Sequence, residues 1–298
     1  MTHLWAIILG AVQGFAEFLP VSSTAHLKLV PWVFGVRDPM LSSTAFDIAL
    51  HAGSFVAIVV ALWRDWLDLV ISAFGGSPTS GEGDLSDDAL RHTSFARKFI
   101  GFLLLTSIPG ALFGVLLSDK IEWLSTPDIA GRVASGIDAA TFHYAPLLLG
   151  VMLIVFGVAL WASDRYVTQE EPLVKLNWWK ALVIGVAQAA ALIPGVSRSG
   201  STMMAGRWVG LKREAVARYS FMAAMPIIGG AMVFGLKDVP LATLFSVDWV
   251  LGFFAAGVSS VLVMRWMLSY VRTHSFAIFM WYRIALGLFV IALFFMRG

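Results

Sequence analysis

The chain has 298 residues, of which 58% are hydrophobic and only 13% are charged, with a mean hydropathy of +0.80. Soluble domains carry about 25% charged residues, so this composition predicts an integral membrane protein. The net charge of +2 is too small an excess to indicate nucleic-acid binding. The absence of cysteine excludes disulfides, thiolate metal sites and a cysteine nucleophile.

The first apolar segment, residues 4–19, is short for a membrane span and carries two polar side chains, Gln13 and Glu17. It ends at Pro20, and a polar stretch follows in which a second helix can begin. A short apolar helix, a proline break and a polar restart predict a re-entrant hairpin rather than a complete span.

The residues around this first break suggest chemistry. Gln13 and Glu17 are four residues apart and therefore share one helical face. Ser22 or Ser23 can cap the next helix, on which Ser23 and His26 are spaced closely enough for hydroxyl and imidazole to interact. A carboxylate, a hydroxyl and an imidazole at one break favour nucleophilic or general acid–base catalysis. The alternative is a capped kink with a buried, hydrogen-bonded histidine.

Three apolar stretches follow, at residues 46–63, 99–118 and 145–162, each long enough or nearly so to cross the membrane. His51 lies inside the first stretch, where we expect a helix-packing or lining role. The loop at 75–92 is rich in Gly, Ser and Asp, which is typical of a solvated connection, and we assign it no function.

A second break follows the short apolar helix at 181–193, which carries Gln188. The sequence at 194–202 reads P-G-V-S-R-S-G-S-T, so Gly195 and Gly200 allow close backbone approach beside Arg198. A helix that restarts here offers free N–H groups to an anion, and Arg198 can hold phosphate with two hydrogen bonds. The alternative is a snorkelling arginine in a Ser/Gly-rich turn. The hydroxyls around the arginine are those of Ser197, Ser199, Ser201 and Thr202.

Three more spans are expected at 219–236, 248–268 and 277–296. Two of them carry an arginine, Arg265 and Arg283, each near a span end where its side chain can snorkel. Many of the 12 tryptophans lie at segment ends, which is typical of an interfacial belt.

The two breaks resemble each other at an offset of 175 residues. Each half therefore holds one hairpin followed by three spans, and an odd number of spans inverts the second half. We predict an all-α integral membrane protein with six transmembrane helices and two re-entrant helical hairpins in an inverted-topology repeat. Residues 1–298 form one membrane domain, with repeats at 1–165 and 175–298. The matching pairs are Gly10 and Gly185, Gln13 and Gln188, Ala16 and Ala191, Val21 and Val196, and Ser22 and Ser197.

Basic residues in the loops set the orientation. The side bearing the termini has fewer of them, so the positive-inside rule places both termini and the site opening outside the cytoplasm of a bacterial inner membrane. We expect a second group to face the cytoplasmic surface and its anionic lipids. The basic residues on the side of the termini are Lys28, Arg37, Lys120, Arg132, Lys237 and Arg297, and the group expected to face anionic lipids is Arg207, Lys212, Arg213 and Arg218.

The two motifs closely resemble the signatures of the undecaprenyl-diphosphate phosphatases, the family linked to bacitracin resistance. They read Q-G-F-A-E-F-L-P-V-S-S-T-A-H at 13–26 and P-G-V-S-R-S-G-S-T at 194–202. The stretch F-D-I-A-L-H-A-G-S at 46–54 is similar to the family's region between the motifs. The resemblance covers essentially the whole chain.

The resemblance implies site residues. Glu17 matches the family's essential acid. Gln13 matches a position that is Glu or Gln in the family. Because this chain has Gln there, the resemblance does not supply two carboxylates for a metal site. Ser23 and His26 match the proposed nucleophile or acid–base group. The family depends on a divalent cation, and Mg²⁺ or Ca²⁺ suits the oxygen ligands Glu17 and Gln13. The expected phosphate-binding residues are Ser22, Gly195, Ser197, Arg198, Ser199, Gly200 and Thr202.

The resemblance implies hydrolysis of a polyprenyl diphosphate lipid to the monophosphate and inorganic phosphate. Direct attack by Ser23 with His26 as base, and water activated by His26 or Glu17, both remain open. The rival function is a lipid-phosphate flippase that uses the same midplane anion site. The expected partners are the lipid substrate and membrane lipids, without nucleic acid, and a homodimer is one expectation for the oligomeric state.

Overall fold

The computed structural model describes residues 2–36, 38–41, 43–76, 93–117, 145–237 and 239–297. Apart from one isolated bridge between Glu171 and Leu211, the regular structure in these ranges is helical. Most of the predicted loop at 75–92 lies outside the described residues, as do Arg37, Lys120 and Arg132.

Each half of the chain begins with a hairpin of two helices, and further helices of different lengths follow. In the first half these are α1 (Thr2–Phe18), α2 (Ser23–Phe34), α3 (Thr44–Ala61), α4 (Trp63–Ala73), α5 (Thr93–Leu116) and α9 (Ala145–Tyr166). In the second half they are α10 (Trp178–Ala189), α11 (Arg198–Trp208), α12 (Arg213–Leu236), α13 (Leu241–Leu244), α14 (Val247–Tyr270) and α15 (Ala277–Arg297), with short 3₁₀ turns at Leu173–Lys175 and Ala190–Leu192.

Five of the described helices, α5, α9, α12, α14 and α15, are long and apolar enough to cross a membrane. A sixth span exists if α3 and α4, which are bent by 66° at Leu62, count as one. The prediction of a multi-pass, all-helical membrane protein is confirmed. The predicted span at 46–63 covers only the first arm of this bent pair.

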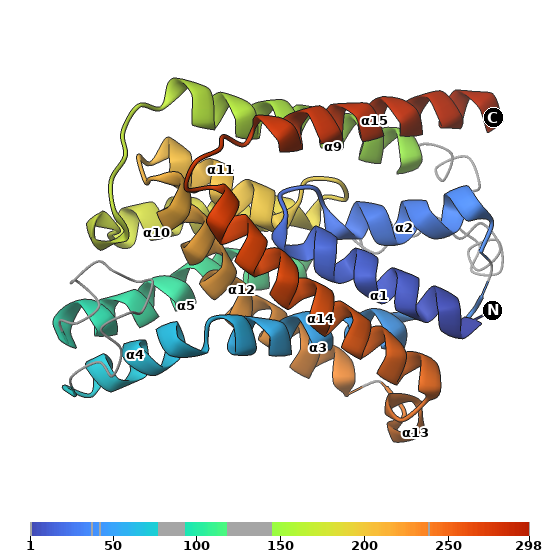
Figure 1. The fold of residues 1–298 in the computed structure, drawn as a ribbon, viewed down its shortest axis with the longest axis horizontal. Helices are drawn as coiled ribbons and strands as arrows, with labels where there is room; N and C mark the ends of the chain where they lie inside the picture. Colours follow the sequence, from blue (N-terminus) through green and yellow to red (C-terminus); the bar gives the residue numbers. More distant parts are fainter. Residues whose placement is uncertain are drawn as a thin grey trace.

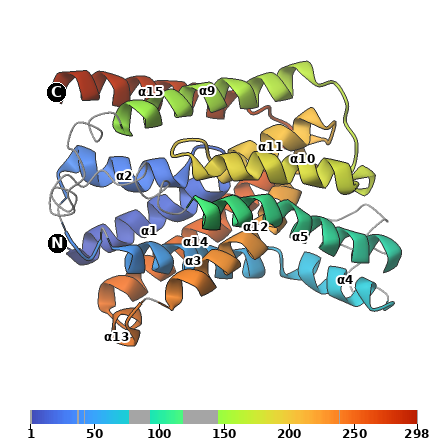
Figure 2. The same cartoon turned by 180° about the vertical axis from the view of Figure 1, so that it is seen from behind.

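The helices run side by side, and α9 and α15 form an outer pair above the others (Figures 1 and 2). The two chain ends lie at the same end of the molecule, and α4 lies at the opposite end (Figure 1). The first helix of each hairpin packs on a span of the other half, because α1 lies along α14 and α10 lies along α5. The two halves are therefore interlocked rather than stacked as separate bodies.

Small residues allow this interlocking. A Cβ atom on Gly14 would lie 2.3 Å from the carbonyl oxygen of Ala256 in α14, and one on Gly185 would lie 2.8 Å from that of Thr106 in α5. Close approach of helix backbones through small residues is the usual packing mode in membranes, where apolar side chains gain little by leaving lipid.

Two arginines expected at the membrane surface are buried instead, so that prediction is wrong for both. Arg207 forms ion pairs with Asp164 at 3.3 Å and Glu170 at 3.1 Å, and only 1% of its side chain is exposed. Arg218 donates to both carboxylate oxygens of Asp65 at 2.9 Å. Tertiary contacts with acids let these guanidinium groups be buried.

Candidate active site

Both chain breaks have the same local conformation. α1 ends at Phe18, and α2 is capped by Ser22, whose hydroxyl accepts from the N–H of Ala25. α11 is capped by Ser197, whose hydroxyl accepts from the N–H of Gly200. The expectation that a serine caps the first break is therefore confirmed.

The two capping serines have unusual backbones. The φ angles of Ser22 and Ser197 are 77° and 78°, and within the described ranges no other non-glycine residue has a positive φ. Such a conformation costs about 1–3 kcal/mol in a residue with a side chain, so the surrounding contacts must hold it. Strained positions of this kind concentrate at functional sites.

A buried carboxylate joins the two breaks. Glu17 Oε1 accepts from Arg198 Nη2 at 2.9 Å, across 181 residues of sequence. Glu17 Oε2 accepts from Ser23 Oγ at 2.6 Å and from Gln13 Nε2 at 3.1 Å. The structure therefore joins three residues of the first break to Arg198 of the second.

Arg198 is held from a second side. Its Nη1 donates to the carbonyl oxygen of Ser220 in α12 at 3.0 Å, and Thr202 Oγ1 lies 2.6 Å from the hydroxyl of Ser220. Arg198 Nε and Gln13 Oε1 are buried without a hydrogen-bond partner among the described residues. The cluster thus contains an unused donor and an unused acceptor, and such groups are expensive to bury unless a ligand or water satisfies them.

The remaining hydroxyls and glycines of the second break hold its shape. Ser199 Oγ donates to the carbonyl oxygen of Leu19 at 2.8 Å and so links the breaks directly. Gly195 has a φ of +92°, and a Cβ there would lie 2.8 Å from the carbonyl oxygen of Leu149. A Cβ on Gly200 would lie 3.1 Å from Arg283 Nη1, so both glycines are needed for packing against protein.

His26 makes different contacts from those its spacing suggested. Its Nδ1 lies 2.7 Å from the carbonyl oxygen of Ser22, and its Nε2 lies 2.6 Å from the hydroxyl of Tyr282. Because a carbonyl oxygen only accepts, Nδ1 carries the proton and Nε2 accepts from Tyr282. The hydroxyl of Ser23 is bonded to Glu17, not to His26. Sequence reasoning missed Tyr282, which is 256 residues away along the chain.

Arg283 is the second residue that sequence reasoning misplaced. It is fully buried rather than snorkelling. Its guanidinium donates to the carbonyl oxygen of Pro20 in the first break at 3.0 Å and to those of Gly195 and Val196 in the second at 2.9 and 3.1 Å. It also donates to Leu153 of α9 at 3.0 Å. The available signal was a charge inside an apolar span, which membrane proteins retain where it has buried partners.

The oxygen donors of this site suit a cation that is bound partly by substrate phosphates rather than one enclosed by protein ligands. The described residues contain no group of three or more His, Cys, Asp or Glu side chains placed to hold a metal. Glu17 supplies one carboxylate, and Gln13 Oε1 is an acceptor without a partner in the described part of the chain. Mg²⁺ is commonly held by one or two carboxylates together with substrate phosphates, which is the combination available here.

Comparisons with known proteins show the family to which this chain is related. Residues 6–289 match the family model described as Bacitracin resistance protein BacA. A protein of Moorella thermoacetica named undecaprenyl-diphosphatase is 39% identical over 297 residues, with both chains fully covered. Proteins of the same name from Desulforudis audaxviator and Pelotomaculum thermopropionicum are 41% and 38% identical, covering 100% and 98% of this chain and 100% and 97% of their own.

Replacing Arg283 should loosen both breaks at once. Arg283→Met removes the donor from carbonyl oxygens that stay buried, and we expect a loss of about 3 kcal/mol or more in unfolding free energy. Arg283→Lys should recover only part of this, since one ammonium cannot reach all of the acceptors.

Unfolding in detergent, followed by circular dichroism, measures this effect. Arg165→Met is the matched control, because Arg165 is exposed at the end of α9. An Arg283→Met variant as stable as the Arg165→Met variant would contradict the role of Arg283 as the clamp between the breaks.

Proposed function

The chain belongs to the bacitracin resistance protein BacA family, and we propose that it hydrolyses undecaprenyl diphosphate to undecaprenyl monophosphate and inorganic phosphate. In this family the reaction recycles the lipid carrier of cell-wall synthesis. The observation that carries the proposal for this chain is the contact of Glu17 with both Ser23 and Arg198. This contact groups a hydroxyl, a carboxylate and a guanidinium around one point, which supports roles as nucleophile, base and phosphate ligand.

We propose that the diphosphate replaces Glu17 on Arg198. A phosphate can accept two parallel hydrogen bonds from a guanidinium, and Arg198 Nε is still unpaired in the described structure. Arg198 then stabilises charge that develops on the transferred phosphoryl group. Glu17 and Gln13 would hold Mg²⁺ or Ca²⁺, which supplies further charge neutralisation to the phosphates when bound.

The hydrogen bond from Ser23 to Glu17 supports Ser23 as the nucleophile. Its oxygen attacks the terminal phosphorus and its proton passes to Glu17, while the bond to the bridging oxygen breaks and undecaprenyl monophosphate leaves. Water then hydrolyses the phosphoserine and releases inorganic phosphate. His26 is bonded to Tyr282 rather than Ser23, which favours Glu17 as the base for this step. In the competing mechanism water attacks directly.

We also propose the finer architecture of six spans and two re-entrant hairpins in an inverted repeat. Two features support it: the capping serines, Ser22 and Ser197, share a positive φ, and α1 and α10 pack reciprocally on spans of the opposite half. This arrangement also suits a flippase, but a carrier has no need of a serine hydroxyl on a buried carboxylate. The distribution of basic loops supports an orientation with both termini and the site opening on the outer side of the inner membrane.

Phosphate release from a long-chain polyprenyl diphosphate by the purified full chain tests the function. We expect release that needs Mg²⁺ or Ca²⁺ and stops with chelator. Glu17→Gln and Arg198→Met should each lower turnover by about 100-fold or more, the usual effect of losing an essential electrostatic group. Arg165→Met is the control. If both site variants stay within tenfold of wild type, this site is not the catalytic one, and no release by folded wild type would favour the flippase.

Ser23→Ala distinguishes the two mechanisms. If Ser23 is the nucleophile, turnover should fall by about 1,000-fold or more, and radiolabelled phosphate should be trapped on the wild-type protein by acid quenching but not on the variant. Turnover within tenfold of wild type, together with unlabelled wild-type protein, would instead assign the attack to water.

Single cysteines test the orientation, since the chain has none of its own. The two substitutions are Lys237→Cys and Lys175→Cys. Lys237 lies at the end of α12 on the side of the termini, and Lys175 lies in the connection before α10. Both residues are exposed. In intact cells a membrane-impermeant maleimide should label position 237 and leave position 175 unlabelled. The reverse pattern would place the termini in the cytoplasm.

A further inference from the structure

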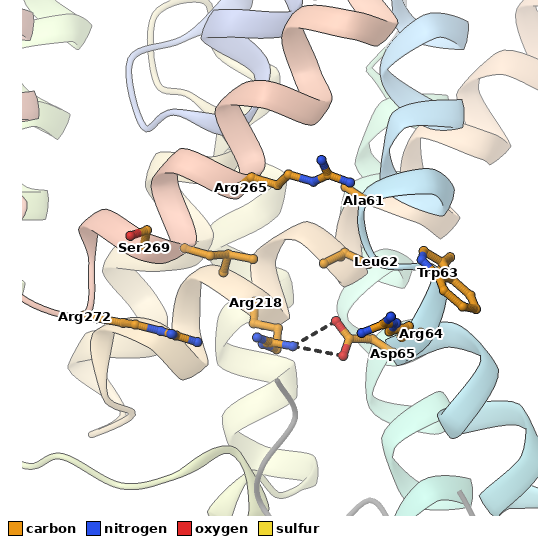
Figure 3. Close-up of a pocket in the computed structure, with 10 residues that line it drawn as sticks. Ala61, Leu62, Trp63, Arg64, Asp65, Arg218, Arg265, Ser269 and Arg272 are labelled. Atoms are coloured by element: carbon orange, nitrogen blue, oxygen red, sulfur yellow. Dashed lines mark hydrogen bonds and ion pairs between the residues drawn. The ribbon is translucent and has the colours of Figure 1, made fainter. Parts of the chain in front are cut away.

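A second cluster of arginines surrounds a cavity that the proposed reaction does not use. The cavity has a volume of about 410 Å³ and lies between the bend joining α3 to α4 and the last turns of α14. In Figure 3 Arg265 extends from α14 toward the bend, with Arg218 and Arg272 below it. The charged residues around it are Arg64, Asp65, Arg218, Arg265 and Arg272.

The cavity is separate from the candidate active site. Arg218 lines it from α12, whereas the side chain of Ser220, two residues further on, is hydrogen-bonded to Thr202 beside the active site. Two residues correspond to about 200° around a helix axis, so the two clusters occupy opposite faces of α12. α12 forms a wall between them.

Positive charge exceeds negative charge here. Asp65 pairs with Arg218, and Glu214 pairs with Arg272 at 3.2 Å. No acidic residue in the described part of the chain forms an ion pair with Arg64 or with Arg265. Two guanidinium charges therefore remain to attract an anion into the cavity.

The surroundings indicate that the anion belongs to a lipid. Arg64 lies over the ring of Trp63, with its Cζ 5.3 Å from the ring centroid. Trp63 is 53% exposed and Trp266, next to Arg265, is 47% exposed. Exposed tryptophans at the ends of apolar helices are typical of the headgroup level of a bilayer. Basic pockets between helices at that level are typical sites for phosphate headgroups.

We propose that this cavity binds the phosphate of an anionic phospholipid, with Arg64 and Arg265 as its principal ligands. Guanidinium groups can each give a phosphodiester two hydrogen bonds, while the exposed tryptophans contact the glycerol and upper acyl chain. The pocket opens on the membrane face that carries α4, away from both chain ends. It is a lipid site additional to the substrate site.

Native mass spectrometry of the full chain in mixed micelles tests this proposal, with phosphatidylglycerol and phosphatidylcholine as probes. Wild type should retain phosphatidylglycerol in preference to phosphatidylcholine. The double variant Arg64→Gln and Arg265→Gln should weaken phosphatidylglycerol binding by about tenfold or more. Arg165→Gln, which removes an exposed arginine outside the cavity, should change it by less than about twofold. The single variants serve if the double variant is poorly folded.

Inorganic phosphate distinguishes the two sources of the anion. If only other anionic lipids displace phosphatidylglycerol, the ligand of the cavity is a lipid headgroup. If inorganic phosphate also displaces it, the cavity binds a free anion at the same site. Binding that is unchanged in the double variant, or equally weakened by Arg165→Gln, overturns the proposal. Phosphate release should be unaffected by these variants, so this result is independent of the proposed reaction.

Discussion

The hydrogen bonds of one buried guanidinium hold the centre of this protein together. Arg283 donates to the carbonyl oxygens of Pro20, Gly195 and Val196, which belong to the two broken helices. At a break, backbone carbonyls lose their helical partners, and lipid offers no replacement. A single arginine on α15 supplies donors to both breaks, so the shape of each depends on the other.

The ion pair between Glu17 and Arg198 is a second connection between the two breaks, and it lies among the candidate site residues. A carboxylate on the arginine proposed to bind phosphate keeps both charges compensated when no substrate is present. The unpaired Arg198 Nε and Gln13 Oε1 indicate that the cluster is not fully satisfied in this state. A ligand that brings both an anion and a cation would satisfy both atoms, which is the character of a metal-bound diphosphate.

The two arginine clusters show how differently one residue type is used on the two faces of α12. Arg198 is 13% exposed and donates to a buried carboxylate at 2.9 Å, which suits the proposed binding of the transferred phosphoryl group. The arginines at the α3–α4 bend surround a cavity beside exposed tryptophans, which suits the proposed headgroup site. The burial of each arginine and the groups around it, rather than the residue type, therefore distinguish the proposed catalytic role from the proposed lipid-binding role.

The sequence by itself determined the membrane class, the approximate spans and both breaks, because apolar length, proline and capping serines act over a few neighbouring residues. It also identified Glu17, Ser23 and Arg198. The tertiary structure decided their partners: Ser23 bonds Glu17 rather than His26, and Tyr282 and Arg283 reach residues more than 250 positions away. Local periodicity cannot encode the contacts of Tyr282 and Arg283, since they arise only when α15, packed on α9, brings these side chains to the breaks.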